Sequence, residues 1–478
     1  MNVNASPLLS LPPDGRLVHT PSGGLEIERG GLRLPLGDLE PALRAAVEAL
    51  AAGGATEAEL LTRIHAAGGG GALLRFHQML ADLNRMRLLC REASCSGEPL
   101  VTVVPCSRSA PETTGPPERE AAPGAFILSR FACLRREGRS LIAESPLAHA
   151  YLVLHGARGA LLLARLAAPA DSAGLAAEGI AGLREDEAAL CLDLLREAGF
   201  LSPVDADGGA REDADPELRT WEFHDLLFHS RSRAGRHRNP YGGTWPFRGV
   251  IDPLPALQPK RSDDTVELFR PDLEQLSRDD PPFTRVLEER RSRREPGERP
   301  VTVRELGELL FRSGRVRKVI PAAMHEVSDR VYPGGGAVYE LEIYPVVRSC
   351  AGLAPGLYRY DPGDHRLERL SGMSPEARRL LESAGRTAGA EIPEVLLVLA
   401  ARFQRVTWKY RSMAYAGILK NVGVLYQTMC LVATAMGLSA CALGGGDSDL
   451  FARAAGTRYT AETSVGELIL NRGPADLG

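Results

Sequence analysis

Hydrophobic positions recur at helical spacing in two stretches near the start of the chain. Residues 1–106 contain three such segments and then a β-type run, in the order LEPALRAAVEALAAGG, ATEAELLTRIHAAGG, ALLRFHQMLADLNRMRLL and EPLVTVVP. Residues 125–204 repeat this order with ARGALLLARLA, SAGLAAEGIAGL and REDEAALCLDLLREAGFLSPV. Thr56 and Glu59 have the spacing of a capping box. Three short helices with a trailing strand predict a winged-helix-like module, so we expect two in tandem.

Residues 218–478 alternate apolar strands with helical stretches. The expected strands are AVYELEIYPVV, GLYRYD, EVLLVLAAR, SACALGGG and GELILNRG, and the helices are TVRELGELLFRSG, PEARRLLESAG and AYAGILKNVGVLYQTMCLVATAMG. GLYRYDPGDHRLERL predicts a hairpin that turns at DPGD. This pattern predicts an α+β domain. Residues 107–124 and 205–217 lack periodicity and predict linkers, so we expect domains at 1–106, 125–204 and 218–478.

Composition narrows the function classes. The 478 residues carry a net charge of −4, and the third helix of each module is mixed or acidic, which favours peptide or protein binding over DNA binding. The eight cysteines form no CxxC pair and predict a reduced, cytoplasmic protein without a structural metal. The N-terminus lacks the pattern of a signal peptide.

One uncharged stretch, residues 421–446, raises the question of a membrane span. It contains Asn421, Gln427 and several glycines, and Gly437 interrupts it. A transmembrane helix needs ~20 predominantly apolar residues. We therefore expect a buried helix followed by a buried strand, and no membrane.

Two kinds of loop could bind a ligand. VLEERRSRREPG groups Arg290, Arg291, Ser292 and Arg294, whose guanidinium forks match phosphate geometry. Glycine-rich loops precede one strand and follow another, and glycine lets backbone N–H groups approach a flat ligand. Alone, the arginine run is better explained as a solvated basic loop, whereas each glycine loop fits a loop without a ligand equally well. Neither glycine loop is a GxGxxG or Walker motif, so no Rossmann or P-loop site is indicated.

VTWKYRSMAYAG places Lys409 beside Tyr410. A tyrosine whose phenol pKa is lowered by an adjacent ammonium can act as a general base. Consecutive side chains reach one site only from a loop or a helix start, because a strand points them to opposite faces. The alternative is an exposed basic-aromatic turn. Glu340 and Glu342 lie on one face of a strand, and we interpret them as structural.

The order of six motifs resembles that of SagB-type dehydrogenases, FMN-dependent azoline oxidases of the nitroreductase superfamily. The motifs are FHDLLFHSRSRAGRHRNPYGGT, ERRSRR, YPGGGAVYELEIYP, GLYRYDP, WKYRSMAYAG and ALGGGDSDLF, within residues 218–478. The two N-terminal modules resemble the peptide-clamp modules that precede such domains. The resemblance implies a nitroreductase-like FMN domain after two winged-helix-like modules. It also implies oxidation of thiazoline or oxazoline rings, made by a partner cyclodehydratase in a ribosomally synthesised precursor peptide, to azoles.

The resemblance also assigns roles to residues. The FMN phosphate and ribityl chain are expected at Arg290, Arg291, Ser292 and Arg294, the isoalloxazine at Pro333, Gly335, Gly336 and Ala337, and the rest of the cofactor site at Gly444, Gly445 and Arg472. Tyr410 is expected to take the azoline Cα proton while hydride passes to the flavin, and Lys409 to lower the phenol pKa. The usual Pro-Ser of nitroreductases is Pro333-Gly334 here, so one hydroxyl is missing.

Assembly and substrate binding follow from the same resemblance. The flavin of the superfamily lies between subunits, so we expect a homodimer with the uncharged helix GVLYQTMCLVATAMG in its interface. We expect a peptide to add as a strand to PLVTVVP, residues 99–105, as the exposed edge of the first module. The alternatives are an NAD(P)H-dependent nitro or quinone reductase, and a scaffold that docks peptides without flavin.

Overall fold

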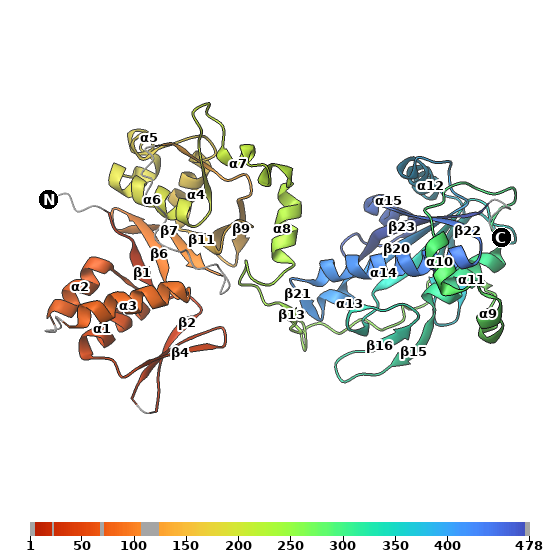
Figure 1. Ribbon diagram of the computed structural model, residues 1–478, viewed down its shortest axis with the longest axis horizontal. Helices are drawn as coiled ribbons and strands as arrows, with labels where there is room; N and C mark the ends of the chain where they lie inside the picture. Colours follow the sequence, from red (N-terminus) through yellow and green to blue (C-terminus); the bar gives the residue numbers. More distant parts are fainter. Residues whose placement is uncertain (1–4, 22, 67–70, 107–123, 474–478) are drawn as a thin grey trace. The chain divides into compact units, whose positions relative to one another are not determined.

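The computed structural model describes residues 5–21, 23–66, 71–106 and 124–473 (Figure 1). Its contacts divide the chain into two compact units, Met1–Asn239 and Pro240–Gly478. The expected linker at 107–124 lies outside the described residues except for Gly124. The three domain boundaries drawn from the sequence stay a prediction.

The helices of the first unit follow the hydrophobic periodicity. Both sets of three predicted helices are present, and the capping box is confirmed because Glu59 N donates to Thr56 Oγ1 over 3.3 Å while Thr56 N donates to the Glu59 carboxylate over 2.8 Å. After these six helices come two more, α7 and α8. The helices are α1 (Pro41–Ala51), α2 (Glu57–Ala66), α3 (Ala72–Arg85), α4 (Gly156–Arg165), α5 (Ser172–Ala177), α6 (Glu185–Glu197), α7 (Arg211–Ala214) and α8 (Phe223–Arg231).

One seven-stranded sheet is shared by the two halves of this unit. Its order is β5-β1-β6-β7-β11-β10-β9. The predicted exposed edge at 99–105 is therefore wrong: it belongs to β7, which pairs with β6 on one side and β11 on the other. The strands are β1 (Leu8–Ser10), β5 (Ala55–Thr56), β6 (Cys90–Cys95), β7 (Glu98–Pro105), β9 (Cys133–Glu137), β10 (Ser140–Glu144) and β11 (Ala150–Leu154), while β8 (Phe126–Leu128) and β12 (Leu201–Pro203) form a separate pair.

A small sheet ahead of α1 was not predicted from the sequence. It has the order β2-β3-β4, formed by β2 (Gly15–His19), β3 (Leu25–Arg29) and β4 (Leu32–Gly37). LEIERGGLRLPLG alternates apolar and polar residues around a Gly-Gly turn, which is a hairpin signal. Among the residues that the structure describes, β4 pairs with β3 alone, which makes it an edge strand.

The second unit is a seven-stranded antiparallel sheet between two layers of helices. Its order is β14-β19-β18-β17-β20-β23-β22, and the predicted hairpin is β18–β19. Alternate residues of β17 and β20 face opposite layers: Ile343 and Leu399 pack with α11 and α14, whereas Tyr344 and Val398 pack with α12 and α15. This confirms the expected α+β architecture.

The bounds of this unit match most of the predicted segments. Its helices are α9 (Leu273–Asp279), α10 (Phe283–Glu289), α11 (Val303–Gly314), α12 (Pro375–Ala388), α13 (Phe403–Thr407), α14 (Ala414–Ala435) and α15 (Ser448–Ala455). Its strands are β13 (Gly242–Gly243), β14 (Thr265–Glu267), β15 (Val316–Ile320), β16 (Val327–Arg330), β17 (Leu341–Val347), β18 (Gly356–Asp361), β19 (Arg366–Ser371), β20 (Val395–Arg402), β21 (Tyr410–Arg411), β22 (Leu438–Leu443) and β23 (Glu462–Arg472).

The uncharged stretch forms α14 and then β22, as expected. Within the described part of the chain, α14 alone is long and apolar enough to cross a membrane. It packs on the sheet through a stripe formed by Ile418, Val422, Leu425, Met429 and Ala433. Gly437, with φ +66°, separates the helix from the strand. The face of α14 away from the sheet stays partly exposed.

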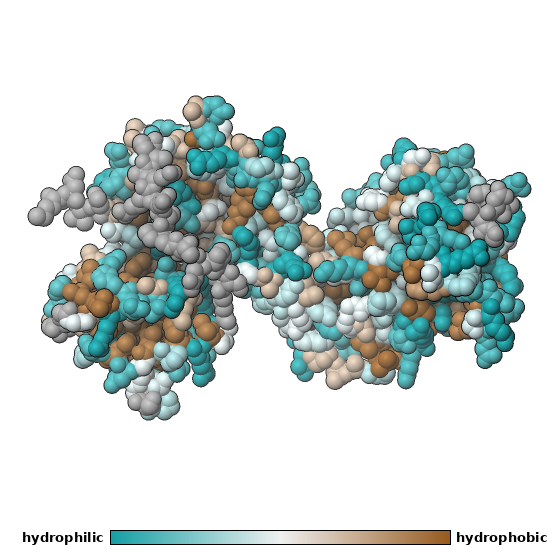
Figure 2. Space-filling model, viewed as in Figure 1, coloured by the Kyte–Doolittle hydropathy of each residue, from teal (hydrophilic) through white to brown (hydrophobic). Residues whose placement is uncertain are grey.

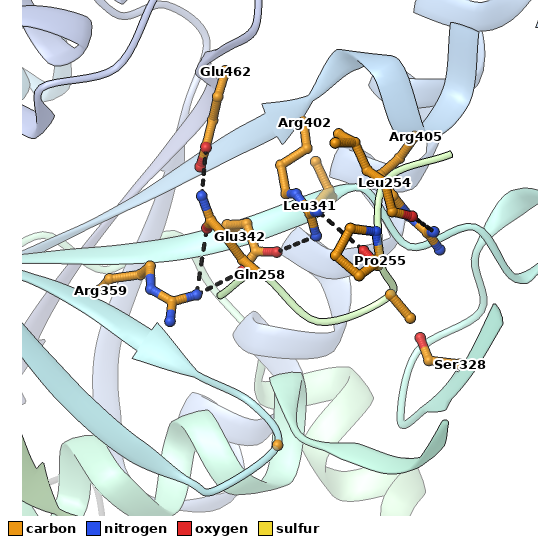
Figure 3. A network of polar contacts seen from close by, with 12 residues as sticks. Leu254, Pro255, Gln258, Ser328, Leu341, Glu342, Arg359, Arg402, Arg405 and Glu462 are labelled. Atoms are coloured by element: carbon orange, nitrogen blue, oxygen red, sulfur yellow. Dashed lines mark hydrogen bonds and ion pairs between the residues drawn. The ribbon is translucent and has the colours of Figure 1, made fainter. Parts of the chain in front are cut away.

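A segment that we name the strap, residues 240–262, crosses the sheet and is held by buried polar side chains (Figure 3). Arg402 donates to the Pro255 carbonyl over 3.0 Å and contacts the buried Glu342 over 3.3 Å. Arg405 donates to the carbonyls of Leu254 (2.7 Å), Glu326 (3.0 Å) and Val338 (3.1 Å). Burial, and then Arg402 and Arg330, lower the pKa of Arg405 to about 10. One guanidinium therefore joins the strap to the loop that ends at Val338.

We expect Arg405→Lys to lower the free energy of unfolding by about 3 kcal/mol, because a single ammonium cannot span three carbonyls and leaves some of them unsatisfied. Urea denaturation measures this. Arg379→Lys, at an exposed position of α12, is the matched control and should change stability by less than about 0.5 kcal/mol. Equal stability of the two variants would contradict this role of Arg405.

Candidate functional site

Lys409 lies in the tight turn that follows α13, and Tyr410 is the first residue of β21. β21 pairs with β13 of the strap, so that Tyr410 lies opposite Gly243. The Lys409 carbonyl accepts hydrogen bonds from the backbone N–H groups of Thr244 (3.1 Å) and Trp245 (3.2 Å). Both side chains of the pair are half-buried. The turn geometry lets consecutive side chains reach one site, as the sequence required.

Gly336 is the point on which these two side chains converge. Lys409 Nζ donates to the Gly336 carbonyl over 3.2 Å. A Cβ at Gly336 would lie 2.2 Å from Tyr410 Oη and 2.5 Å from Lys409 Nζ, which is closer than any real contact. Its φ of +63° also belongs to the left-handed region. Glycine at this position therefore brings an ammonium and a phenol together.

The loop around Gly336 is held in an unusual conformation. Ala337 (φ +56°) and Tyr339 (φ +48°) are non-glycine residues with left-handed backbones. Such conformations concentrate at functional sites, where the surrounding structure imposes them. Gly335 N donates to Asn421 Oδ1 over 3.1 Å, and Asn421 Nδ2 donates to the Glu340 carboxylate over 2.9 Å.

Asn421 of α14 and Glu340, which directly precedes β17, support the loop. Glu340 is fully buried, and burial raises the pKa of its carboxyl group. Its contact with Asn421 agrees with the structural role expected for this acid. Asn421 was noted in the sequence only as a polar residue in an apolar helix. Its amide fixes the glycine loop, which sequence reasoning missed.

The arginine-rich segment lies elsewhere on the same unit, beside β22 and β23. Arg293 N donates to the Ala440 carbonyl over 3.1 Å, and Asn471 Nδ2 donates to the Arg294 carbonyl over 2.7 Å. Among the described atoms, Arg294 Nε is buried without a hydrogen-bond partner. Arg290 is near enough to Cys430 of α14 that its charge opposes the rise in the thiol pKa caused by burial. A guanidinium with an unused buried donor fits an anionic group such as a phosphate.

The second glycine loop is open to a ligand, whereas the Arg472 side chain is already engaged by protein groups. A Cβ at Gly444 or Gly445 would meet open space, so a ligand can approach the backbone there. Arg472, in contrast, donates to the Gly437 carbonyl over 3.0 Å and lies 3.4 Å from the Glu305 carboxylate. Its guanidinium already holds the chain end against α11 and the α14–β22 turn.

The predicted site residues thus form two clusters along α14. The glycine-loop cluster consists of Gly335, Gly336, Lys409 and Tyr410 and contacts the helix at Asn421. The arginine cluster consists of residues 290–294 and lies near Cys430. Nine residues of helix span about 13 Å, and no hydrogen bond between described residues joins the two clusters. The two clusters fit FMN in chemistry, since one offers cations for a phosphate and the other offers glycine backbone without side chains.

Two aromatic side chains near Lys409, Trp245 and His325, escaped the sequence analysis. They pack with Trp408 of the WKYR motif, with ring centroids 5.4–5.8 Å apart. Both ring nitrogens of His325 are buried and lack partners among the described atoms. Burial, and then Arg405 and Lys409, lower the pKa of His325. Nothing in the sequence links these residues, because the strap, the β15–β16 loop and α13 meet only in the fold.

The first unit contains an open groove between β4 and α3. Its walls are Leu34 and Leu36 of the strand and Leu74, Met79 and Met86 at α3, with a cavity volume of about 470 Å³. Leu74 is 78% exposed, an unusual state for a leucine beside other apolar residues. Figure 2 shows apolar side chains gathered over this part of the unit.

Models of known families match three consecutive parts of the chain. Residues 9–111 match the ThcOx helix turn helix domain, residues 126–238 match the cyanobactin oxidase ThcOx, and residues 287–467 match the nitroreductase family. The order confirms the resemblance to a peptide-modifying oxidase of the nitroreductase superfamily.

Individual relatives agree with these matches. The chain is 32% identical over 186 residues to a nitroreductase-family protein of Methanocaldococcus jannaschii, MJ1384, and covers 85% of it and 38% of itself. It is 29% identical to the microcin B17-processing protein McbC of Escherichia coli, but spans only 42% of that protein and 23% of itself.

Solved structures show weaker similarity. A nitroreductase-type structure from Ralstonia eutropha has 20% identity and a TM-score of 0.35, and covers 49% of this chain and 99% of that chain. The Escherichia coli microcin synthetase McbBCD with truncated pro-MccB17 has 22% identity and a TM-score of 0.32. The match covers 38% of this chain and 69% of that chain. At these TM-scores neither structure defines the geometry of the site.

We expect Gly336→Ala to lower the free energy of unfolding by about 1–2 kcal/mol, because the left-handed backbone disfavours alanine, and to displace the ends of the Tyr410 and Lys409 side chains. Gly445→Ala is the matched control, since its methyl group would meet open space, and should cost less than about 1 kcal/mol. Urea denaturation compares them. Similar costs at both glycines would contradict the left-handed backbone at Gly336.

Proposed function

The chain belongs to the nitroreductase family, and on that premise we propose that it is an FMN-dependent dehydrogenase that oxidises azoline rings of a ribosomally made peptide to azoles. The observation that carries this proposal is the convergence of Lys409 and Tyr410 on Gly336. Conversion of an azoline to an azole removes two electrons and two protons, and it needs a base beside the ring carbon. The matches to the cyanobactin oxidase and to McbC support this substrate class.

The side chains of this chain supply the acid–base part of the reaction. Tyr410 takes the Cα proton of the azoline, and Lys409, held on the Gly336 carbonyl, stabilises the phenolate that does so. The strap covers this pair from one side and limits its contact with water. FMN, when bound, supplies the two-electron acceptor.

The cofactor would be held by both clusters. Arg290, Arg291, Ser292 and Arg294 would bind the phosphate and ribityl chain, and Arg294 Nε has an unused donor for it. Pro333, Gly335, Gly336 and Ala337 would line the isoalloxazine, with Gly444 and Gly445 completing the site. Arg472 would support the segment through Gly437 and Glu305 rather than face the phosphate.

A homodimer would unite the two clusters. α14 buries a single stripe in its own unit, while apolar residues of its other faces, among them Leu419 (39% exposed), stay accessible (Figure 2). Pairing of this helix with a second copy would cover those residues. It would also place the glycine loop of one protomer near the arginine cluster of the other.

The precursor peptide would bind in the groove of the first unit. β4 offers an unpaired edge, and its inward leucines face the apolar side of α3. An extended peptide can add to such an edge through its backbone while its side chains fill the groove. This site replaces residues 99–105, which lie inside the sheet. A cyclodehydratase would be the partner that makes the azolines.

The function is tested with a peptide that already contains azolines, monitored by mass spectrometry. The parental protein should remove two hydrogens per ring, and Tyr410→Phe should slow this by about 10²–10⁴-fold, because a positioned base contributes that much. Both proteins should be yellow and release FMN on heating. Unchanged azole formation by Tyr410→Phe would exclude it as the base. NAD(P)H oxidation without any effect on the peptide would instead indicate a general flavin reductase.

Peptide docking is tested by placing a charge in the groove. Leu74→Glu should weaken binding of a labelled precursor peptide by at least about tenfold, because the carboxylate is desolvated by a bound strand. Fluorescence polarisation measures the affinity. Leu161→Glu, at a similarly exposed leucine of α4, is the control and should bind like the parent. Equal affinity of both variants would rule out the groove.

A further inference from the structure

The strap residue Trp245 contacts the Lys409 side chain directly. Lys409 Nζ lies 5.3 Å from the centroid of the Trp245 ring, within the range of a cation–π interaction. Residue 245 falls between the family matches, which end at 238 and resume at 287. None of those matches therefore gives this residue a role.

The backbone of Trp245 is held in place for this contact. Its N–H donates to the Lys409 carbonyl over 3.2 Å, so the two residues are joined through main chain and side chain. Its φ of +52° is a genuine outlier for a bulky residue. The strap imposes this conformation through its pairing with β21 and its anchors on Arg402 and Arg405.

The indole ring of Trp245 is also held in place by two neighbouring aromatic side chains. Trp408 meets it edge-on at 5.6 Å and is itself fixed by a hydrogen bond from its Nε1 to the Ile251 carbonyl, over 2.7 Å. His325 packs at 5.4 Å on an edge. Burial lowers the pKa of His325 and so favours its neutral imidazole. The aromatic side chains around Trp245 therefore add no charge that would repel the Lys409 ammonium.

We propose that Trp245 is a positioning residue whose indole face holds the Lys409 ammonium beside Tyr410. The ammonium then has three contacts, which together restrict the long lysine side chain: the Gly336 carbonyl, the Tyr410 ring at 5.1 Å and the indole of Trp245. Without the indole, Lys409 keeps its charge but samples positions away from the phenol. The consequence for catalysis rests on the proposed function, whereas the positioning itself does not.

Amine acetylation tests the positioning directly, because the chain contains only four lysines. Lys260 and Lys318 are exposed and serve as internal references in each digest. In the parent, Lys409 should acetylate more slowly than Lys318. Trp245→Leu should raise the rate at Lys409 relative to Lys318 by about 3- to 30-fold, the range expected for loss of a cation–π contact. An unchanged ratio would overturn the proposal.

Two further variants complete the test. Trp245→Phe keeps an aromatic face and should give a smaller rise at Lys409; if Trp245→Leu does not fold, the absence of any rise in Trp245→Phe overturns the proposal. Trp221→Leu removes a tryptophan of the first unit and should leave Lys409 protected.

The activity readout separates this proposal from the proposed function. With an azoline peptide, Trp245→Leu should lower kcat by a similar factor and leave the KM unchanged, and the acidic limb of its pH–rate profile should move to higher pH. Loss of protection with a parental kcat and pH profile would overturn the link to catalysis. Loss of protection in a protein whose parent never oxidises azolines would support the positioning and reject the proposed function.

Discussion

The close approach of two side chains to the backbone of Gly336 is the constraint on which the site depends. An ammonium and a phenol share the space that a methyl group would occupy, and the left-handed conformation of the residue directs its carbonyl to Lys409. In the neighbouring loop, the non-glycine residues Ala337 and Tyr339 adopt the unfavourable left-handed conformation. Asn421 and Arg405 hold it from opposite sides, through Gly335 and Val338.

The surrounding fold supplies the rigidity that this geometry needs. A sheet buried on both faces carries β17 and β20, and the polar residues at their ends point toward the strap rather than into the apolar layers. Arg402 and Arg405 each use a buried guanidinium to capture strap carbonyls. The strap in turn brings Thr244 and Trp245 against Lys409. The Lys409–Tyr410 pair is thus held by its own turn, by the glycine loop and by the strap.

The local hydrophobic pattern predicted most helices and strands of the fold. The predictions failed where a strand's pairing partner is distant in sequence or where the strands are short. Helices such as α3, α11 and α14 follow directly from periodicity, as does the β18–β19 hairpin. Residues 99–105 were correctly read as a strand, but their second neighbour, β11, comes from the other half of the unit, so the exposed edge was wrong. The strands β2–β4 are short, and Pro35 interrupts their pattern.

The candidate site also divides into residues that a local motif identified and residues whose roles depend on partners distant in sequence. Lys409, Tyr410 and the glycine loop were identified by motif, and the structure brings them together. Which of the three glycines is indispensable depends on a contact with residues more than seventy positions away. Trp245, His325 and Asn421 carry no local signal of their roles, since each acts through a partner distant in sequence. Arg472 was assigned to the cofactor by resemblance, but its hydrogen bonds are to the protein.

Single-turnover reduction of the flavin decides whether an azoline ring, and not a nicotinamide, is the electron donor of this protein. The purified yellow protein is mixed anaerobically with an azoline peptide in a stopped-flow spectrometer. The oxidised-flavin absorbance should bleach with the peptide alone, at the rate at which azole appears. A flavin that stays oxidised with the peptide and bleaches on addition of NADPH would exclude the azoline as the donor.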